Sequence, residues 1–342
     1  MRVLSDIDVS GKRVFVRADL DVPLREAQAS NDERLTTNAE VATRLTNLKP
    51  TVDYLFENGA EKVIIAGHLD RPKWFDPALS TKNLKSSLEK ILSRSVIFAE
   101  NFEKQVLENL VLLENLRFWP GETQNDQSFA HQLANLADIY INEAFGNCHR
   151  NHASMVSLPS LLPHAAGFHL AKEVEELTKI LNDPEKPFVA IVGGAKIETK
   201  LPLVEHLAKI ADFVLVGGEL PVEIKERKMT FAQNVMVASL TSDAKDISEE
   251  SIKQFCDVIA SAKTVVWNGP QGLFEEGHNR GSLEIAESII NSGAYTVVGG
   301  GETVEFLAKN NLLSRFSFVS SGGGAMLELL AGKKLPALEA LQ

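Results

Sequence analysis

Cysteine is scarce in this chain of 342 residues, which contains only Cys148 and Cys256. The two thiols lie far apart, and neither belongs to a CxxC or Cys/His pattern. Small domains held together by disulfides, and zinc modules, both need a denser set of such residues. The sequence therefore suggests neither a disulfide framework nor a zinc site, and we expect both cysteines to be plain reduced thiols.

Long hydrophobic runs are missing as well. No stretch of 18 apolar residues occurs, and the N-terminus, MRVLSDIDVSGKRVFV, lacks the unbroken apolar segment of a signal peptide. We expect a cytoplasmic protein that does not bind membranes. With 44% hydrophobic and 24% charged residues the composition is that of a globular chain. The length suits two domains of about 150 residues each.

The chain also has no excess of positive charge, because its formal net charge is -11. Nonspecific binding to nucleic acid needs a basic surface, as does binding to an anionic membrane, so we expect neither partner. Any anionic ligand must instead be held by a local cluster of basic side chains or backbone amides.

Short apolar runs alternate with helical patterns through the first half. In PTVDYLFENGA and DQSFAHQLANLAD the apolar residues recur at intervals of three and four, which indicates helices. The runs predict strands at Arg13–Arg17, Lys62–Ala66, Ser95–Ala99, Val111–Leu113 and Asp138–Ile141. Such alternation is typical of a parallel sheet with crossover helices.

The second half repeats this order after LAKEVEELTKIL, which we interpret as a connecting helix within residues 170–186, followed by the stop NDPEKP. Its strands end in glycines: FVAIVGGAK, FVLVGGEL, TVVWNGPQG, YTVVGGGET and FSFVSSGGGA. We therefore predict an α/β protein with two parallel-sheet domains, residues 1–169 and 187–330. Ligands of open parallel sheets bind beyond the carboxyl ends of the strands, so two ligands are expected at two kinds of strand end.

Charged residues follow the strands of the first half. Arg17, Arg71, Arg117 and Arg150 each stand near a strand end, and an arginine fork grips carboxylate or phosphate oxygens in bidentate fashion. Together they predict an anion pocket. The alternative is that each arginine lies on the surface or pairs with a nearby acid.

Two other polar groups lie among these arginines. Asp19 and Asp21 share one side of an extended segment and could accept hydrogen bonds from a ligand hydroxyl, or form a solvated acidic turn before Pro23. His149 and His152 are three residues apart, but no third ligand or HExxH pattern accompanies them, so we do not expect a metal there.

Glycine-rich loops follow the strands of the second half. GGAKIETK places Lys196 and Lys200 on one face of an opening helix, a geometry that suits a phosphate group. GGGET carries Glu302, a carboxylate that could hold Mg²⁺. No Walker loop and no GxGxxG pattern is present, which disfavours an NAD-dependent dehydrogenase. Glycines also serve tight turns for steric reasons alone.

In this order the motifs resemble the phosphoglycerate kinase family. The matching stretches include VRADLDVPL, GHLDRP, LLENLRFWPGE, NEAFGNCHRNHAS, FVAIVGGAKIETK, KTVVWNGPQGLFE, VVGGGET and SSGGGAMLELLAGKKLPALEAL, which together run from about Arg13 to the C-terminus. The resemblance implies two Rossmann-like three-layer (αβα) domains joined by a hinge helix, with residues 331–342 returning to the first. It also implies a monomer that transfers a phosphoryl group between 1,3-bisphosphoglycerate and ADP, giving 3-phosphoglycerate and ATP, with Mg²⁺.

The resemblance carries roles to particular positions. Those for the acid substrate are Asp19, Asp21, Arg44, His68, Arg71, Arg117 and Arg150. Those for the nucleotide are Lys196, Lys200, Asn268, Glu275, Gly300, Gly301, Glu302 and Thr303, with Glu302 as the metal ligand. The implied catalytic set is Arg44, Lys196 and Gly323. Arg44 is preferred to Arg34 because TRLTNLKPTVDYL keeps the family's interval between arginine and proline.

The chain departs from the family pattern at several places. Asp21 replaces an asparagine, Asp70 a glycine, and Glu143 and Glu302 aspartates. The segment after Leu220 is several dozen residues shorter, on the side where the family walls the base and ribose of its nucleotide. A degenerate member that binds a phosphorylated acid or a protein without turnover is therefore the alternative to an active kinase.

Overall fold

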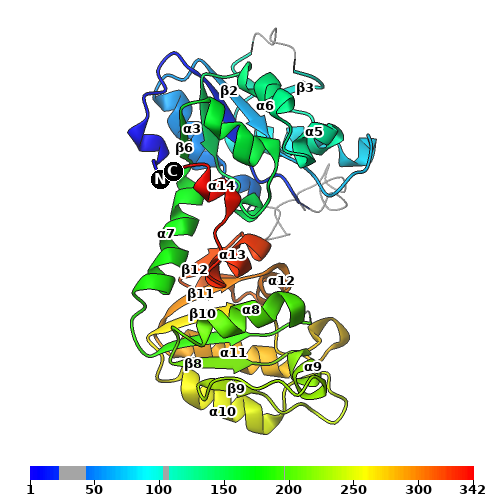
Figure 1. The fold of residues 1–342 in the computed structure, drawn as a ribbon, viewed down its shortest axis with the longest axis vertical. Helices are drawn as coiled ribbons and strands as arrows, with labels where there is room; N and C mark the ends of the chain where they lie inside the picture. The colour runs from blue at the N-terminus through cyan, green and yellow to red at the C-terminus, as the bar shows by residue number, and fades with distance from the viewer. Residues whose placement is uncertain (23–43, 103–107, 196) are drawn as a thin grey trace. The chain divides into compact units, whose positions relative to one another are not determined.

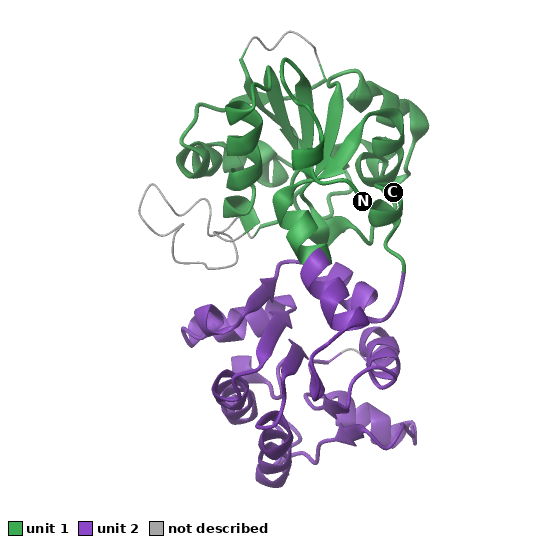
Figure 2. Cartoon of the chain, turned by 90° about the vertical axis from the view of Figure 1, so that its left-hand side faces the viewer, with its two compact units in different colours: residues 1–174, 334–342 green, residues 175–333 purple. Residues whose placement is uncertain are grey.

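The computed structural model describes residues 1–22, 44–102, 108–195 and 197–342. The chain forms two compact units, one of residues 1–174 and 334–342 and the other of residues 175–333 (Figure 2). Among the described residues, no helix is both long and apolar enough to cross a membrane.

The first unit is built on a six-stranded parallel sheet in the order β3-β4-β2-β1-β5-β6. The strands are β1 (Arg13–Arg17), β2 (Lys62–Ala66), β3 (Ile97–Ala99), β4 (Leu110–Leu113), β5 (Ile139–Asn142) and β6 (His164–Ala166). The helices are α3 (Lys49–Glu57), α4 (Lys85–Leu92), α5 (Pro120–Thr123), α6 (Gln127–Ala134), α14 (Pro336–Glu339) and the first part of α7 (Phe168–Asn182). Val14 and Val16 pack toward α3 and α4, whereas Phe15 stacks on Tyr140. Successive side chains of a strand point to opposite faces of the sheet, and here both faces are covered.

The second unit repeats this design with the order β12-β11-β10-β7-β8-β9, again all parallel. Its strands are β7 (Phe188–Val192), β8 (Phe213–Val216), β9 (Val235–Val237), β10 (Thr264–Asn268), β11 (Tyr295–Gly299) and β12 (Phe318–Ser320). Its helices are α8 (Ile197–Leu207), α9 (Leu220–Glu226), α10 (Glu249–Ile259), α11 (Arg280–Asn291), α12 (Gly301–Lys309) and α13 (Gly323–Leu330) (Figure 1).

Helix α10 shows how the sequence specifies one of these elements. Ser248 precedes the first turn, and its hydroxyl accepts the Ser251 amide at 3.2 Å as an N-cap. Ile252, Phe255 and Ile259 then recur at intervals of three and four and are all buried in the core of the second unit. The helix is therefore fixed by one cap and one apolar stripe.

The structure corrects several details of the expected elements. β6 and β9 were not predicted. β6 (HAA) has no β-branched or aromatic-rich run, and β9 (VMV) lacks the glycines that follow the predicted strands of the second half. β3 begins at Ile97 rather than Ser95, and the connecting helix ends at Asn182, before the prolines of NDPEKP.

Helix α7 crosses the boundary between the units, which lies between Val174 and Glu175. Its first turn is held by Glu143, which accepts the Leu170 amide at 3.0 Å and the His169 amide at 3.3 Å. Burial raises the pKa of Glu143 to about 7, although these hydrogen bonds and that of Thr51 oppose the shift. At the other end of the chain, the Ala337 amide donates to the Cys148 carbonyl at 3.1 Å, which joins α14 to the first unit.

Candidate active site

Arg17, the last residue of β1, is fully buried beneath a cluster of charged side chains in the first unit. Its guanidinium donates to the Ser154 hydroxyl at 2.8 Å and to the Ala18 carbonyl at 2.6 Å. It also contacts Nδ1 of His68 at 2.8 Å. Within the described residues, Arg17 is thus neither on the surface nor paired with an acid, as the alternative to anion binding proposed; it is buried and hydrogen-bonds to Ser154, Ala18 and His68.

His68 follows β2 and is buried. A guanidinium has no acceptor, so Nδ1 of His68 must accept from Arg17 and the ring proton must lie on Nε2. Burial, then the charges of Arg17 and Arg117, hold the pKa of His68 well below its ordinary value. His68 is therefore a neutral donor whose Nε2 lies 3.9 Å from Oδ2 of Asp21.

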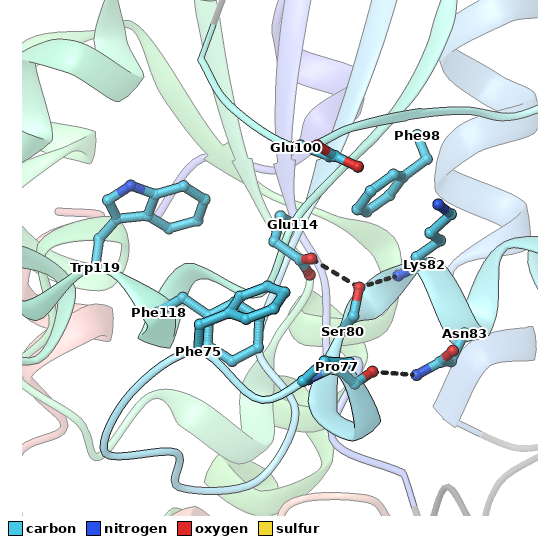
Figure 3. A pocket seen from close by; sticks show the side chains of 10 residues that line it. All are labelled: Phe75, Pro77, Ser80, Lys82, Asn83, Phe98, Glu100, Glu114, Phe118 and Trp119. Atoms are coloured by element: carbon cyan, nitrogen blue, oxygen red, sulfur yellow. Dashed lines mark hydrogen bonds between the residues drawn. The ribbon is translucent and has the colours of Figure 1, made fainter.

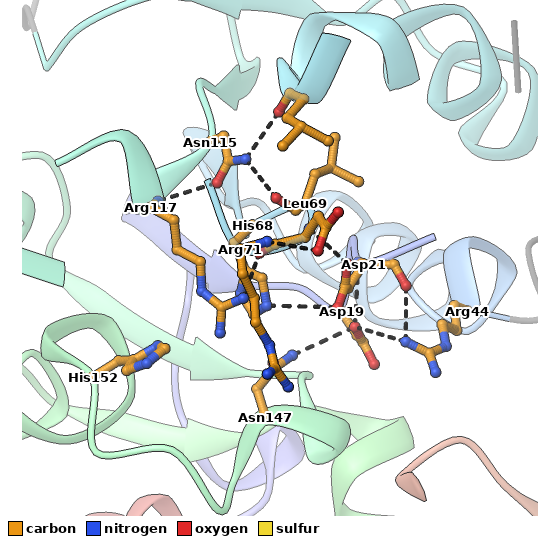
Figure 4. Close-up of polar contacts among 12 residues, drawn as sticks. Asp19, Asp21, Arg44, His68, Leu69, Arg71, Asn115, Arg117, Asn147 and His152 are labelled. Atoms are coloured by element: carbon orange, nitrogen blue, oxygen red, sulfur yellow. Dashed lines mark hydrogen bonds and ion pairs between the residues drawn. The ribbon is translucent and has the colours of Figure 1, made fainter. Parts of the chain in front are cut away.

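Asp19 and Asp21 extend from the end of β1 into the same cluster (Figure 4). Oδ1 of Asp19 accepts from Asn147 at 3.4 Å and lies 3.6 Å from Nη1 of Arg44. Oδ2 of Asp19 is buried and has no hydrogen-bond partner among the described residues. A buried carboxylate oxygen normally has a donor, so this atom suits a ligand hydroxyl. Arg44 also donates to the Asp21 carbonyl at 2.8 Å.

Asp70 forms a turn that joins three members of the cluster. Its φ of 50° is left-handed, so the positive φ expected for the family's glycine is present in this chain with an aspartate. Its amide donates to Oδ1 of Asp21 at 2.8 Å, and its own Oδ1 accepts the Arg71 amide at 2.8 Å. Its carbonyl accepts from Arg117. Figure 4 shows the Arg71 side chain running from this turn toward Asn147.

Arg117 lies on η5 (Leu116–Phe118), a short 3-10 turn after β4 that Asn115 caps. Burial, then the charge of Arg17, lowers the pKa of Arg117 to about 10, and the nearby Asp21 opposes the shift. Its Nε is buried and has no hydrogen-bond partner among the described residues. A guanidinium in this state gains from an anionic ligand.

Arg150 is half-buried and lies near His152. Burial, then Arg117, Arg17 and Arg150, lowers the pKa of His152 to about 3, and the rings of His68 and His152 lie 6.3 Å apart. His68 and His152 are therefore both neutral at physiological pH. The arginines consequently dominate this part of an otherwise acidic protein.

The second unit presents a different kind of site at the ends of β7, β10 and β11. Lys200 of α8 is buried and donates to Oδ1 of Asn268, the last residue of β10. Burial lowers the pKa of Lys200 to about 8, and the charge of Glu302 opposes that shift. Nδ2 of Asn268 is buried without a hydrogen-bond partner in the described part of the chain. Lys196 lies outside the described residues.

Backbone conformation organises the rest of this site. Gly300 precedes α12 with a φ of 98°, and a Cβ there would lie 3.0 Å from Nδ2 of Asn268. The Thr303 hydroxyl accepts the Gly269 amide at 2.7 Å, which ties α12 to the end of β10. Gly323 is the first residue of α13, and no atom lies within 4 Å of where its Cβ would be. Helix N-termini with glycine loops are suited to bind phosphate groups.

A small pocket of about 60 Å³ opens between these loops, and its lining includes Gly194, Gly218, Lys245, Glu275 and Glu302. This volume is smaller than that of a typical site for a whole small-molecule ligand. Gly218 and Lys245 were not among the predicted residues. Gly218 stands in the GGEL loop that the sequence displays, whereas nothing near Lys245 in the sequence indicated a role.

The predicted residues thus fall into two groups. Direct contacts bring together Asp19, Asp21, Arg44 and His68, and the Asp70 turn adds Arg71 and Arg117. In the other unit, Lys200, Asn268, Gly300, Glu302 and Thr303 lie around the ends of β10 and β11, and Gly301 begins α12. Glu275 is exposed at the pocket.

The phosphoglycerate kinase family profile matches residues 4–239 and 219–333. Two curated relatives carry that name: the Wolinella succinogenes protein, 34% identical with 99% of this chain and 96% of the relative covered, and the cytosolic wheat enzyme (Triticum aestivum), 37% identical with 99% and 97% covered. The alignment with the former has 398 positions, 56 more than the 342 residues of this chain. A deletion relative to the family is therefore present.

Two solved structures of phosphoglycerate kinases agree with the fold. That from Coxiella burnetii has a TM-score of 0.83 at 31% identity, with 99% of this chain and 98% of the other covered. That from Pyrococcus horikoshii has a TM-score of 0.83 at 26% identity, with 100% and 98% covered. The predicted fold class is confirmed, and the chain belongs to the phosphoglycerate kinase family.

Proposed function

We propose that the chain is an active phosphoglycerate kinase, which transfers a phosphoryl group reversibly between 1,3-bisphosphoglycerate and ADP, giving 3-phosphoglycerate and ATP. The cluster of arginines around the buried Asp19 carries this proposal. A three-carbon acid with a phosphate, a carboxylate and a hydroxyl offers anions to Arg71, Arg117 and Arg150. Its hydroxyl offers a donor to the unpaired oxygen of Asp19.

The acid substrate would bind in the first unit. Asp19, Asp21, His68 and the arginines fix its orientation, and the neutral His68 directs a proton rather than a charge into the site. Arg44 contacts Asp19 and the Asp21 backbone, and we assign its guanidinium to the carboxylate oxygen of the acid that accepts the phosphoryl group. Orientation of this kind removes much of the entropic barrier to transfer.

The nucleotide would bind in the second unit, with its phosphates on the amides of the glycine loops and on Lys200. We assign Lys196 and Gly323 to the transferring phosphoryl group, where positive charge stabilises its oxygens. The exposed Glu302 lies in the first turn of α12, with its carboxylate close to Gly194.

Mg²⁺ fits this arrangement. The ion commonly takes one or two carboxylates and completes its shell with water and substrate phosphates, and Glu302 supplies one such carboxylate at the pocket. When bound, Mg²⁺ would neutralise charge on the phosphate oxygens. We place the enzyme in the cytoplasm as a monomer; the cytosolic name of the wheat relative supports the compartment.

A coupled assay with ATP and 3-phosphoglycerate tests the proposal. We expect turnover that Lys196→Ala abolishes, because the replacement removes the cation assigned to the transferring group. Lys209→Ala, an exposed lysine of the same unit, is the matched control and should retain full activity. Absence of turnover in the unmodified protein at millimolar substrates would overturn the proposal and favour a degenerate member.

A further inference from the structure

A second cavity lies in the first unit beside the charged cluster. It has a volume of about 600 Å³ and opens beyond the carboxyl ends of β3 and β4, from which Glu100 and Glu114 extend (Figure 3). The turn η5 forms a shared wall, because it supplies Arg117 to the cluster and Phe118 to the cavity. Cavities of this size at this edge of a sheet hold small molecules. None of the residues proposed for the kinase reaction lines it.

Aromatic side chains make up much of its lining: Phe75, Phe98, Phe118 and Trp119. The rings of Phe75 and Phe118 lie 4.9 Å apart. Phe75 is nevertheless 60% exposed, which is unusual for a large apolar side chain. The faces of such rings carry partial negative charge and attract cations, and Lys82 already places its ammonium 5.7 Å from the centre of the Phe98 ring.

The charged groups of the lining also favour a cation. Glu114 is buried, and its two oxygens are used unequally. Among the described residues, Oε1 accepts the amides of Thr81 and Asn115, whereas Oε2 accepts the Ser80 hydroxyl alone, at 2.7 Å, and retains capacity for another donor. Glu100 is exposed at the rim. The two carboxylates outnumber the single ammonium of Lys82.

We propose that this cavity binds a small planar organic cation, such as an amidinium, a guanidinium or a protonated aromatic amine. The flat body of the ligand lies against the aromatic rings, and its charge faces Glu114 and Glu100. No residue proposed for the kinase reaction lines this cavity, so either proposal can be wrong without affecting the other.

Three probes of nearly the same shape test the charge preference: benzamidine, which is a cation, benzamide, which is neutral, and benzoate, which is an anion. Each is titrated into the full-length protein while the indole N–H resonance of Trp119 is followed by NMR. The resonance is identified by its loss in Trp119→Phe. We expect benzamidine to bind at least about tenfold more tightly than benzamide, and benzoate to bind weakest. Equal binding of all three, binding of none, or a preference for benzoate would overturn the proposal.

Two substitutions should change benzamidine affinity in opposite directions. Glu100→Gln removes a carboxylate and should weaken binding about three- to tenfold, whereas Lys82→Met keeps the stem, removes the competing ammonium and should strengthen it by a similar factor. Glu57→Gln, an exposed carboxylate outside the cavity, is the control and should change nothing. Glu114 is left intact because its hydrogen bonds hold the surrounding turns. Affinities that are unchanged in both variants, or that move in the same direction, would contradict the assignment.

Discussion

The candidate site of the first unit is made of side chains, whereas that of the second is made largely of backbone. Arg44 donates to the Asp21 carbonyl, and Arg117 donates to the Asp70 carbonyl. His68 is buried and accepts from Arg17. In the second unit, Gly300 and Gly194 bring backbone amides to the same edge of the sheet through left-handed conformations. A side-chain site depends on charge and shape, and a glycine site depends on backbone conformation. Substitutions in one unit should therefore change the binding of one substrate and leave the binding of the other unchanged.

Among the substitutions that compare the two units, the largest effect is expected for Arg117→Lys. A lysine keeps the charge but loses the planar fork, so kcat/KM for 3-phosphoglycerate should fall about a hundredfold. Steady-state kinetics measure this fall, and calorimetry should show unchanged ADP affinity. Arg94→Lys, an exposed arginine of the same unit, is the control. A parallel loss of ADP affinity would show that the two sites do not bind their substrates independently.

Gly300→Ala should have the converse effect on the second unit. At a φ of 98° an alanine is strained, and its Cβ would lie 3.0 Å from Nδ2 of Asn268. We expect ADP affinity to fall about tenfold or more as the loop shifts, with the affinity for 3-phosphoglycerate unchanged. Gly293→Ala is the matched control, because its φ of 71° is also positive but the space around it is open. It should lose stability without losing ADP affinity.

The pH dependence of ADP binding should report Lys200. Burial lowers its pKa to about 8, so the free protein loses this charge as the pH rises through 8. Because the phosphates bind the protonated form, the Kd for ADP should rise by up to about tenfold per pH unit above 8. Isothermal titration between pH 7 and 9 measures the slope. Lys200→Arg should flatten it; a slope that persists in this variant would assign the titration to another group.

A smaller effect is expected for Asp21→Asn. Asp21 places negative charge beside the site of an anionic substrate, but its side chain is 42% exposed, so solvent screens part of the repulsion. We expect the KM for 3-phosphoglycerate to fall about three- to tenfold. The asparagine oxygen can still accept the Asp70 amide, so the turn should survive. An unchanged KM would show that the charge is already neutralised by its neighbours.

The sequence was sufficient to predict the alternating α/β order and most strands, because their apolar runs and glycine ends are local signals. It could not predict β6 or β9, because the two alanines of β6 favour no strand and β9 is not followed by glycines. It placed Arg17 among the anion ligands, because a strand-end arginine looks the same whether its partner is a substrate or Ser154. Asn147 and Lys245 were missed for a related reason, since their roles depend on contacts between residues far apart in the chain.

The smallest effect should come from the Asp70 turn, where the two kinds of site overlap. Here the first unit, like the second, has a left-handed backbone conformation. The residue is an aspartate rather than a glycine, and a hydrogen bond to its side chain offsets part of the strain. Left-handed φ costs roughly 1–2 kcal/mol for a residue with a Cβ, and the bond from the Arg71 amide to Oδ1 of Asp70 returns part of it. Asp70→Ala should therefore lower the free energy of unfolding by about 1 kcal/mol, whereas Asp70→Gly should be nearly neutral. Urea denaturation measures both variants. Equal losses in the two would show that the side-chain bond, rather than the backbone conformation, sets the stability of this turn.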